Sequence, residues 1–254
     1  MQLRLLRHAT IIVKMRESRI LVDPMFSRKG TLPPIIFSPN SRPNPLVELP
    51  LGDAELAELL NNIDGVIVTH THVDHFDAEA AKRIAKGNPV FCQPEDEHKI
   101  RKTGLKDVIP VTKSTSWKDI TITRTGGRHG SVLINPFLGL ISGFIFEMRG
   151  EPKVYVAGDT IWCKEIEQAL TAYHPDIVVA NTGAARLLAG GLITMSCPDI
   201  ERISGILPRA KIVAVHLEAF NHCLLTREKM REYLKEKNLS SQVLIPDDGE
   251  EIFL

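Results

Sequence analysis

The chain has 254 residues, of which 43% are hydrophobic, and 31 basic residues balance 31 acidic residues to give a formal net charge of zero. This length and apolar content can bury a substantial core. A zero net charge gives no indication of a nucleic acid or an anionic membrane surface as partner. Arginines interrupt the apolar residues at the amino terminus and no apolar run has the length of a signal or membrane segment, so we expect a cytoplasmic protein.

Short apolar runs alternate with amphipathic segments along the chain, a pattern typical of strands and helices packed in layers. We expect the strands at 3–6, 10–13, 19–22, 65–69, 90–92, 107–109, 120–123, 140–146, 153–156, 177–180, 211–215 and 242–245. The expected helices are 53–61, 77–86, 94–103, 163–173, 198–207 and 227–237. Asp53 is the expected capping residue of the first helix, and Gly87 is expected to follow the end of the second.

Residues 24–50 form a conspicuous irregular stretch, because seven of these 27 residues are prolines. Prolines at that density forbid a regular helix or a central strand. A loop of this length in a compact domain is usually functional or mobile. A proline-rich connection that simply follows the surface explains the composition equally well.

The segment from His70 to His75 predicts a metal-binding loop. It places His70, His72, Asp74 and His75 within six residues, directly after the apolar run 65–69. Neutral imidazole and carboxylate are preferred ligands of zinc and similar divalent ions. A solvated polar turn would explain one histidine, but three histidines and an aspartate beside a buried strand favour a metal site.

Three later segments each add one candidate ligand at the end of a strand-like run. His129 lies in a glycine-rich turn after the run 120–124, Asp159 follows the run that begins at Val154, and His216 follows the run 212–215. Each of these alone is more often a cap or a hydrogen-bonded turn residue. Their order after the His70–His75 loop is the informative feature.

This loop and the three later residues resemble, in the same order, the H-x-H-x-D-H signature and the remaining ligands of the metallo-β-lactamase superfamily. The resemblance implies a four-layer αββα sandwich that forms one domain over residues 1–254, and a loop 24–50 that borders the active site. It implies two divalent metal ions, for which we expect zinc, with manganese and iron as alternatives. The implied ligands are a first set, a second set and a bridge: His70, His72 and His129; Asp74, His75 and His216; and Asp159.

Two such ions lower the pKa of bound water and can share a hydroxide, which then attacks a carbonyl or phosphoryl centre at neutral pH. We therefore expect a metal-dependent hydrolase of a small ester, lactone or phosphodiester. With one metal, Asp74 could instead act as a catalytic base and proton shuttle. A di-iron oxidoreductase is one alternative, although Val73 stands where such proteins carry a carboxylate. A metal-binding sensor without turnover is the other, and retention of seven candidate ligands argues against it.

A second resemblance lies nearer the amino terminus. Leu6 to Thr10 and Asp23 to Ser27 look like the G-H-A-T and D-P-x-F-S elements of the branch that contains ascorbate-6-phosphate lactonase and N-acylphosphatidylethanolamine phospholipase D, with Arg7 in place of the glycine. The resemblance implies that His8 and Asp23 lie near the metals, as supports of the ligands or as substrate contacts. The alternatives are that Asp23 merely caps a strand end before proline and that His8 is merely a partly buried residue.

Three further residues are candidate contacts of the substrate. Asn181 and Arg186 belong to a glycine-bearing turn after a strand, where backbone N–H groups and a guanidinium can bind phosphate or carboxylate. His222 lies six residues after His216 and could donate a proton to a leaving group. We thus expect a small anionic or phosphorylated substrate. Arg186 as an ordinary surface cation and His222 as a loop-ordering residue remain the alternatives.

The four cysteines are widely spaced, form no C-x-x-C pair and are expected to be reduced. Cys223 lies close enough to His216 to face the pocket, but we favour a packing role. A secreted β-lactamase is disfavoured because no export signal is visible, and transfer-RNA processing is disfavoured because no long basic arm is visible. We expect no nucleic acid partner and no membrane span, and an oligomer is compatible with the sequence.

Overall fold

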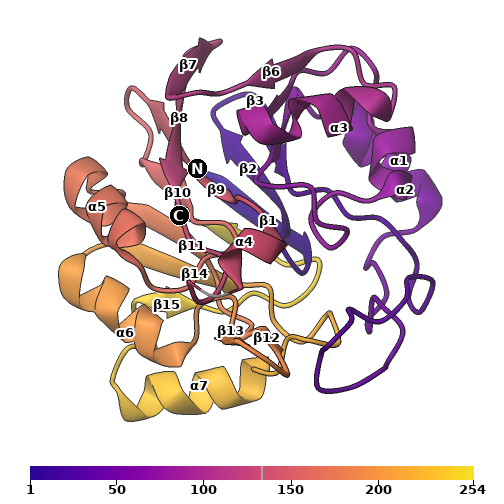
Figure 1. The fold of residues 1–254 in the computed structure, drawn as a ribbon. Helices are drawn as coiled ribbons and strands as arrows, with labels where there is room; N and C mark the ends of the chain where they lie inside the picture. Colours follow the sequence, from indigo (N-terminus) through magenta and orange to yellow (C-terminus); the bar gives the residue numbers. More distant parts are fainter. Residues whose placement is uncertain (133) are drawn as a thin grey trace.

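Two seven-stranded sheets pack face to face, with helices on the outer face of each, in the computed structural model, which describes residues 1–132 and 134–254 (Figure 1). The fold is therefore the αββα sandwich expected from the sequence. The first sheet has the order β16 (Glu251–Phe253), β1 (Gln2–Arg7), β2 (Thr10–Met15), β3 (Ser18–Val22), β4 (Gly65–Val68), β5 (Val90–Cys92) and β6 (Val108–Pro110). The second has the order β15 (Val243–Leu244), β14 (Lys211–Val215), β11 (Ile177–Asn181), β10 (Val154–Val156), β9 (Ser142–Met148), β8 (Ile120–Gly126) and β7 (Ser114–Trp117).

Helices cover the two sheets in two groups. The first sheet carries α1 (Asp53–Asn61), α2 (Ala78–Arg83) and α3 (Glu97–Lys102), which follows the 3-10 turn η1 (Pro94–Asp96). The second carries α5 (Lys164–Tyr173), α6 (Cys197–Ile206) and α7 (Arg227–Glu236). The short helix α4 (Asn135–Leu138) and the hairpin of β12 (Arg186–Leu187) and β13 (Gly191–Leu192) lie outside these layers. Within the described residues, no helix is long and apolar enough to cross a membrane.

The core has three layers because alternate residues of a strand face opposite sides of the sheet. Side chains such as Val13, Phe144 and Val213 fill the space between the two sheets. On the outer faces, Leu56 packs with the α1–α3 layer and Ile166 with the α5–α7 layer. Apolar side chains on both faces of the central strands explain why their sequences read as continuous apolar runs.

Strand direction brings the candidate ligands to one edge of the sandwich. β3 is parallel to β4, and β10, β11 and β14 are parallel to one another. β8 runs in the direction of β10, because both are antiparallel to β9. The loops that leave the carboxyl ends of β4, β8, β10 and β14 carry the His70–His75 segment, His129, Asp159 and His216 respectively. Strand ends that are far apart in the sequence therefore lie close together in space.

Several element predictions need correction. The helix expected at 77–86 spans only Ala78–Arg83, because Asp77 caps it by accepting a hydrogen bond from the N–H of Ala80. The cap of α1 is Gly52, whose N–H donates to Glu55, whereas the Asp53 carboxylate pairs with arginines. The expected helix 94–103 is divided into η1 and α3. The elements that the sequence did not predict are β7, α4, β12, β13 and β16.

The proline-rich segment 24–50 contains no helix or named strand, as predicted. Its two ends are fixed by Arg7, whose buried guanidinium donates hydrogen bonds to the carbonyl oxygens of Met25 at 3.2 Å, Ser27 at 2.8 Å and Val47 at 3.1 Å. The residue that replaces the glycine of the G-H-A-T element thus anchors the segment. Burial lowers the pKa of Arg7 to about 10, which still leaves it charged at neutral pH.

Candidate metal centre

The first ligand set consists of His70, His72 and His129, whose ligand atoms lie within 4.8 Å of one another. Nε2 of His70 and Nδ1 of His72 are 3.0 Å apart. The remaining ring nitrogens are occupied: Nε2 of His72 donates to the carbonyl of Leu138 at 2.8 Å, and Nδ1 of His129 donates to that of Ile193 at 2.9 Å. A carbonyl oxygen only accepts, so these two rings hold their protons away from the centre and direct lone pairs into it.

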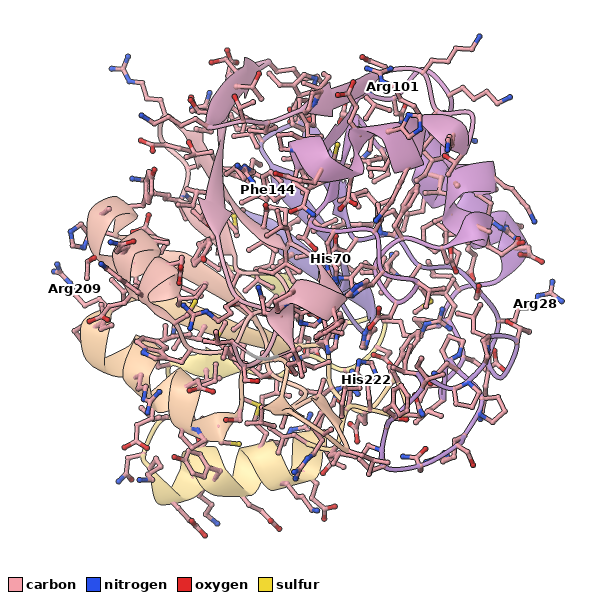
Figure 2. The ribbon with its side chains drawn as sticks, in the orientation of Figure 1. Arg28, His70, Arg101, Phe144, Arg209 and His222 are labelled. Carbon is pink, nitrogen blue, oxygen red and sulfur yellow. The ribbon has the colours of Figure 1, made fainter. Side chains whose placement is uncertain are left out.

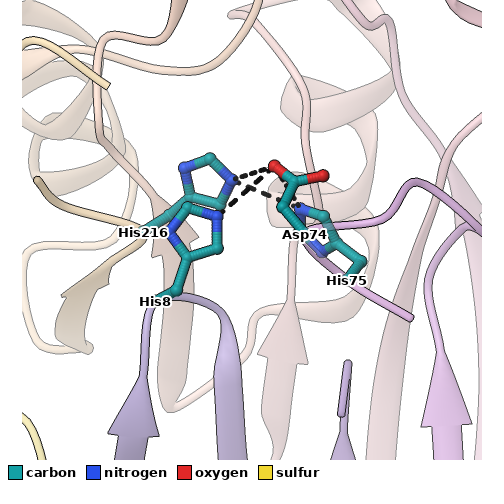
Figure 3. A group of neighbouring side chains, drawn as sticks. All are labelled: His8, Asp74, His75 and His216. Atoms are coloured by element: carbon teal, nitrogen blue, oxygen red, sulfur yellow. Dashed lines mark hydrogen bonds and ion pairs between the residues drawn. The ribbon is translucent and has the colours of Figure 1, made fainter. Parts of the chain in front are cut away.

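The second ligand set brings Asp74, His75 and His216 together with His8, as Figure 3 shows. Nε2 of His75 and Nε2 of His216 are 3.2 Å apart. One oxygen of Asp74 lies 3.9 Å from the first of these nitrogens and 3.7 Å from the second. All four side chains are buried. Four ligand-type atoms thus surround one small volume.

Asp159 lies next to both sets. Its Oδ1 is 3.2 Å from Nε2 of His75 and 3.2 Å from Nε2 of His216. Asp159 also forms a group of ligand atoms within 4.8 Å with His70 of the first set. Asn181 donates a hydrogen bond to the same Oδ1 at 2.7 Å and so fixes its direction.

The protonation of the two sets differs. Burial favours the neutral ring of His75, yet the carboxylates of Asp159, Asp23 and Asp74 outweigh it and raise its pKa to about 10. The pKa of His216 is also raised: burial lowers it, but Asp159, Cys223 and Asp74 together outweigh burial. Burial instead lowers the pKa of His129 to about 4 and that of His70 well below its ordinary value. The carboxylates therefore hold positive charge at the second set, whereas His70 and His129 of the first set are neutral.

The donor set fits divalent metal ions. Imidazole nitrogens and two carboxylates lie close together in this centre. Their electron-rich atoms repel one another unless a proton or a metal cation lies between them. Imidazole and carboxylate are the ligands of zinc in catalytic sites, and the outer nitrogens of such imidazoles are normally held by oxygen acceptors, as those of His72, His75 and His129 are here. The chemistry of these residues is therefore that of a metal centre.

Asp23 and Asn181 each hold the side chain of a candidate ligand. For Asp23 this is one of the two roles that the resemblance implied, and for Asn181 it differs from the expected substrate contact. Asp23 Oδ2 accepts from Nδ1 of His75 at 2.8 Å, and its two oxygens accept from the N–H and hydroxyl of Thr69, both at 2.7 Å. Asn181 donates to Asp159. Both side chains are buried behind the ligands they hold, which leaves them no surface for a substrate.

His8 lies inside the centre. Its Nε2 is 3.4 Å from an oxygen of Asp74, and its ring lies 3.7 Å from that of His216 between centroids. Its Nδ1 is buried and has no hydrogen-bond partner among the described residues. Burial and the neighbouring His216 lower its pKa well below the ordinary value, so a neutral ring faces Asp74.

His222 and Arg186 lie beside the centre. Nε2 of His222 is 3.6 Å from Asp74, and burial lowers the pKa of His222 to about 4. Figure 2 shows His70 and His222 in the central part of the molecule, with Arg28 and Arg209 at its periphery. The side chain of Arg186 is exposed, while its N–H donates to the carbonyl of His222 at 3.0 Å.

Sequence reasoning missed two supporting residues and one contact. Asp96, in a strongly charged stretch, is buried and accepts from the N–H of Thr71 at 3.1 Å, within the H-x-H segment. Asn221 binds the segment 24–50 to the chain next to His222, and no sequence signal pointed to that contact. Cys223 packs in an apolar cluster, as expected, but its Sγ also lies 3.4 Å from Nδ1 of His216.

Comparisons with known proteins agree with this geometry. Residues 18–217 match the model of the family described as β-lactamase superfamily domain. UPF0173 protein YddR from Bacillus subtilis (strain 168) is 38% identical over 256 aligned positions, which cover 98% of each chain. The crystal structure of a possible metal-dependent hydrolase from Veillonella parvula DSM 2008 is 37% identical, with a TM-score of 0.96, over 100% of this chain and 99% of that one. An isothiocyanate hydrolase from Delia radicum gut bacteria is 36% identical, with a TM-score of 0.94, over the same shares of the two chains.

Proposed function

The chain belongs to the β-lactamase superfamily of metal-dependent hydrolases, and from this we propose that it hydrolyses a small molecule at a dinuclear centre of the zinc type. The observation that carries the proposal is the position of Asp159, beside His70 of the first ligand set and beside His75 and His216 of the second. When bound, two such ions supply a hydroxide at neutral pH and polarise the attacked group.

The proposal gives the candidate ligands the following roles. His70, His72 and His129 would hold the first ion, Asp74, His75 and His216 would hold the second, and Asp159 would bridge them. In a form with one ion, Asp74 accepts a proton from water instead. The neutral His222 ring, 3.6 Å from Asp74, donates a hydrogen bond to the leaving group and can pass a proton between it and that carboxylate. We expect Arg186 to pair with an anionic group of the substrate.

For the substrate we propose a small ester, lactone or phosphodiester. An isothiocyanate is a second candidate, favoured by the likeness over the whole chain to an isothiocyanate hydrolase. In that reaction water adds its oxygen to the central carbon of R–N=C=S, its two protons go to nitrogen, and the C–N bond breaks to give R–NH₂ and O=C=S. Both classes present an electrophilic carbon or phosphorus to the same nucleophile, so one centre can serve either.

The test is metal analysis of the purified chain with a panel of aryl esters, lactones, phosphodiesters and benzyl isothiocyanate. We expect two zinc ions per chain and turnover that chelation abolishes. Asp159→Ala should lower the metal content of the second site and nearly abolish turnover. Asp199→Ala is the control, since Asp199 is also buried but binds the amino end of α6. Two ions retained in Asp159→Ala would sink the bridging role, and iron with redox activity but no hydrolysis would favour a di-iron oxidoreductase.

Two variants test the substrate contacts. Removing a charge-assisted hydrogen bond costs about 1.5 to 3 kcal/mol, so Arg186→Ala should raise KM for anionic substrates far more than for neutral ones. His222→Ala should lower kcat with both metals retained, and least for substrates with good leaving groups. Equal losses on neutral and anionic substrates would remove Arg186 from the site, and loss of metal in His222→Ala would make that residue a ligand or its support.

A further inference from the structure

Exposed apolar side chains gather around the metal centre. Among residues 1–132 and 134–254, every large exposed apolar side chain except Phe253 lies on a segment that carries or contacts residues of the centre. Contiguous exposed apolar surface usually marks a ligand groove or an interface. Six of these side chains, given with their exposed fractions, define the apolar rim: Ile36 (75%), Phe37 (70%), Val132 (71%), Phe137 (88%), Leu140 (55%) and Leu188 (72%).

Hydrogen bonds to the first ligand set hold two of the rim segments in place. The carbonyl of Leu138, next to Phe137, accepts from His72 at 2.8 Å. The carbonyl of Ile193, which follows β13, accepts from His129 at 2.9 Å. The segment around α4 and the β12–β13 hairpin therefore lie directly over the histidines, and Figure 1 shows them next to one another.

The proline-rich segment closes the rim on the other side. The N–H of Ile35 donates to Asn221 at 3.0 Å, one residue before His222, and the N–H of Leu188 donates to the carbonyl of Phe37 at 2.6 Å. The tip of the hairpin thus touches the proline-rich segment. The proline-rich segment and the hairpin therefore lie against each other beside the centre.

Space for a ligand lies beside the α4 part of the rim. A cavity of about 200 Å³ is lined by His70, His72, Leu138 and Leu140, and its remaining lining includes the polar and charged residues Gln93, Glu95, Asp96 and Lys99. Leu140 of the rim and two of the candidate ligands therefore border the same cavity. A substrate whose reacting group reaches the histidines would place its remaining atoms against the rim.

Resting on the proposed hydrolytic function, we propose that the apolar rim binds the organic group of the substrate, and that this group is an apolar alkyl or aryl chain. The rim selects by burying apolar surface, an effect that grows with each methylene of the chain. A further charged group of the substrate would lie at the edge, where Arg186 is exposed. The rim thus favours substrates with an apolar tail over compact polar ones.

The test measures binding without turnover. We would titrate the zinc-loaded full chain with alkyl hydroxamates from acetyl to octanoyl by calorimetry, since the hydroxamate head binds zinc and the tail reports on the rim. Burial of a methylene gives at most about a fourfold gain in affinity, and we expect about two- to fourfold per methylene. Phe37→Ser and Phe137→Ser should flatten this dependence and leave the affinity for acetyl hydroxamate unchanged.

Phe253→Ser is the matched control. Phe253 is 73% exposed, yet it lies on β16 opposite Gln2, at the other end of β1 from the turn that carries His8. This variant should retain the full dependence on chain length. If Phe37→Ser, Phe137→Ser and Phe253→Ser all showed the same dependence of affinity on chain length, the proposal would be overturned.

The remaining outcomes separate the rim from the proposed function. Tighter binding of longer tails without hydrolysis of any panel substrate would support the rim and contradict the proposed function. Hydrolysis of a panel substrate, together with an affinity that does not change with chain length, would support the proposed function and contradict the rim. Sedimentation velocity adds one further arm: if Phe137→Ser dissociates an oligomer while the dependence on chain length stays, the rim is an interface between copies and the proposal fails.

Discussion

Asp23 is the single residue that sets the orientation of His75. Its two oxygens serve Nδ1 of His75 and both polar groups of Thr69. An asparagine has only one acceptor oxygen, so it cannot serve all these donors. We predict that Asp23→Asn keeps the fold and weakens zinc binding at the second site by about 10- to 100-fold, the usual effect of losing such a partner. Competition with a chromophoric chelator measures this affinity.

Asp77→Asn is the control for that measurement. Asp77 is also buried, but it caps α2 and accepts from the N–H groups of Phe26 and Ser27. Its replacement should lower the melting temperature and leave zinc affinity unchanged. Equal zinc affinity in Asp23→Asn and the unaltered chain would contradict the orienting role.

Cys223 gives a second prediction for a single residue. Its thiol lies 3.4 Å from Nδ1 of His216, and burial raises its pKa, so the group is a neutral thiol. Cys223→Ser keeps a polar partner for the imidazole, whereas Cys223→Ala removes it. We predict about tenfold weaker zinc binding in the alanine variant only. Cys197→Ala, at a buried cysteine of α6, is the control, and a serine variant as weak as the alanine variant would show that packing alone matters.

The irregular segment 24–50 is held in place largely by hydrogen bonds to one side chain outside it, that of Asn221. Asn221 accepts from Ile35 and Asn44 and donates to Asn40 and Ser38. Each hydrogen bond to a neutral group contributes about 0.5 to 1.5 kcal/mol. We predict that Asn221→Ala lowers the free energy of unfolding by about 2 to 4 kcal/mol and speeds hydrogen exchange in this segment.

Asn62→Ala, which removes one bond at the exposed end of α1, is the control for that exchange measurement. Metal content should stay at the level of the unaltered chain in both variants, since Asn221 touches none of the proposed ligands directly. Unchanged exchange across the segment in Asn221→Ala would show that Arg7 alone anchors it.

Buried central strands could be predicted from the sequence, whereas exposed edge strands could not. The central strands β4, β11 and β14 are buried on both faces, so their continuous apolar runs identified them, and the candidate ligands after β4 and β14 with them. β7 reads Ser-Thr-Ser-Trp and is formed by pairing with β8, a contact that no local pattern encodes. β16 is likewise an exposed edge strand that depends on β1.

For the molecule as a whole, the meeting of the candidate ligands at one edge could be predicted, but most of their supports could not. Parallel strands end at the same edge of a sheet, and the order of the residues along the chain completed the pattern. Asp23 was expected to support a ligand or to contact substrate, and Asn181 to contact substrate. Both are buried behind candidate ligands, because the side toward which a strand-end residue points depends on the packing of the two sheets. The apolar rim is likewise assembled from three segments that are far apart in sequence.

Metal loading should stabilise the whole molecule in a way that depends on pH. In the metal-free fold the pKa of His75 is about 10, above its ordinary value of 6.5, and that of His216 is also raised. Their protonation therefore stabilises the metal-free fold fully below pH 6.5, and this contribution is lost as pH rises toward about 10. In the zinc-loaded fold both rings bind as neutral ligands, so this loss does not occur.

We therefore predict that the melting temperatures of the zinc-loaded and metal-free proteins diverge as the pH rises from about 6.5 to about 9.5, with a difference in stability that grows by a few kcal/mol. His129 and His222, with pKa values of about 4, are neutral in both folded forms across this window, so they add nothing to the difference between these forms. Calorimetry of both forms at matched ionic strength measures the divergence, and the His98→Gln variant, altered at an exposed position on α3, should behave identically. A constant or narrowing difference would mean that the second ligand set holds no displaceable proton, and so that the carboxylates around His75 do not control metal binding.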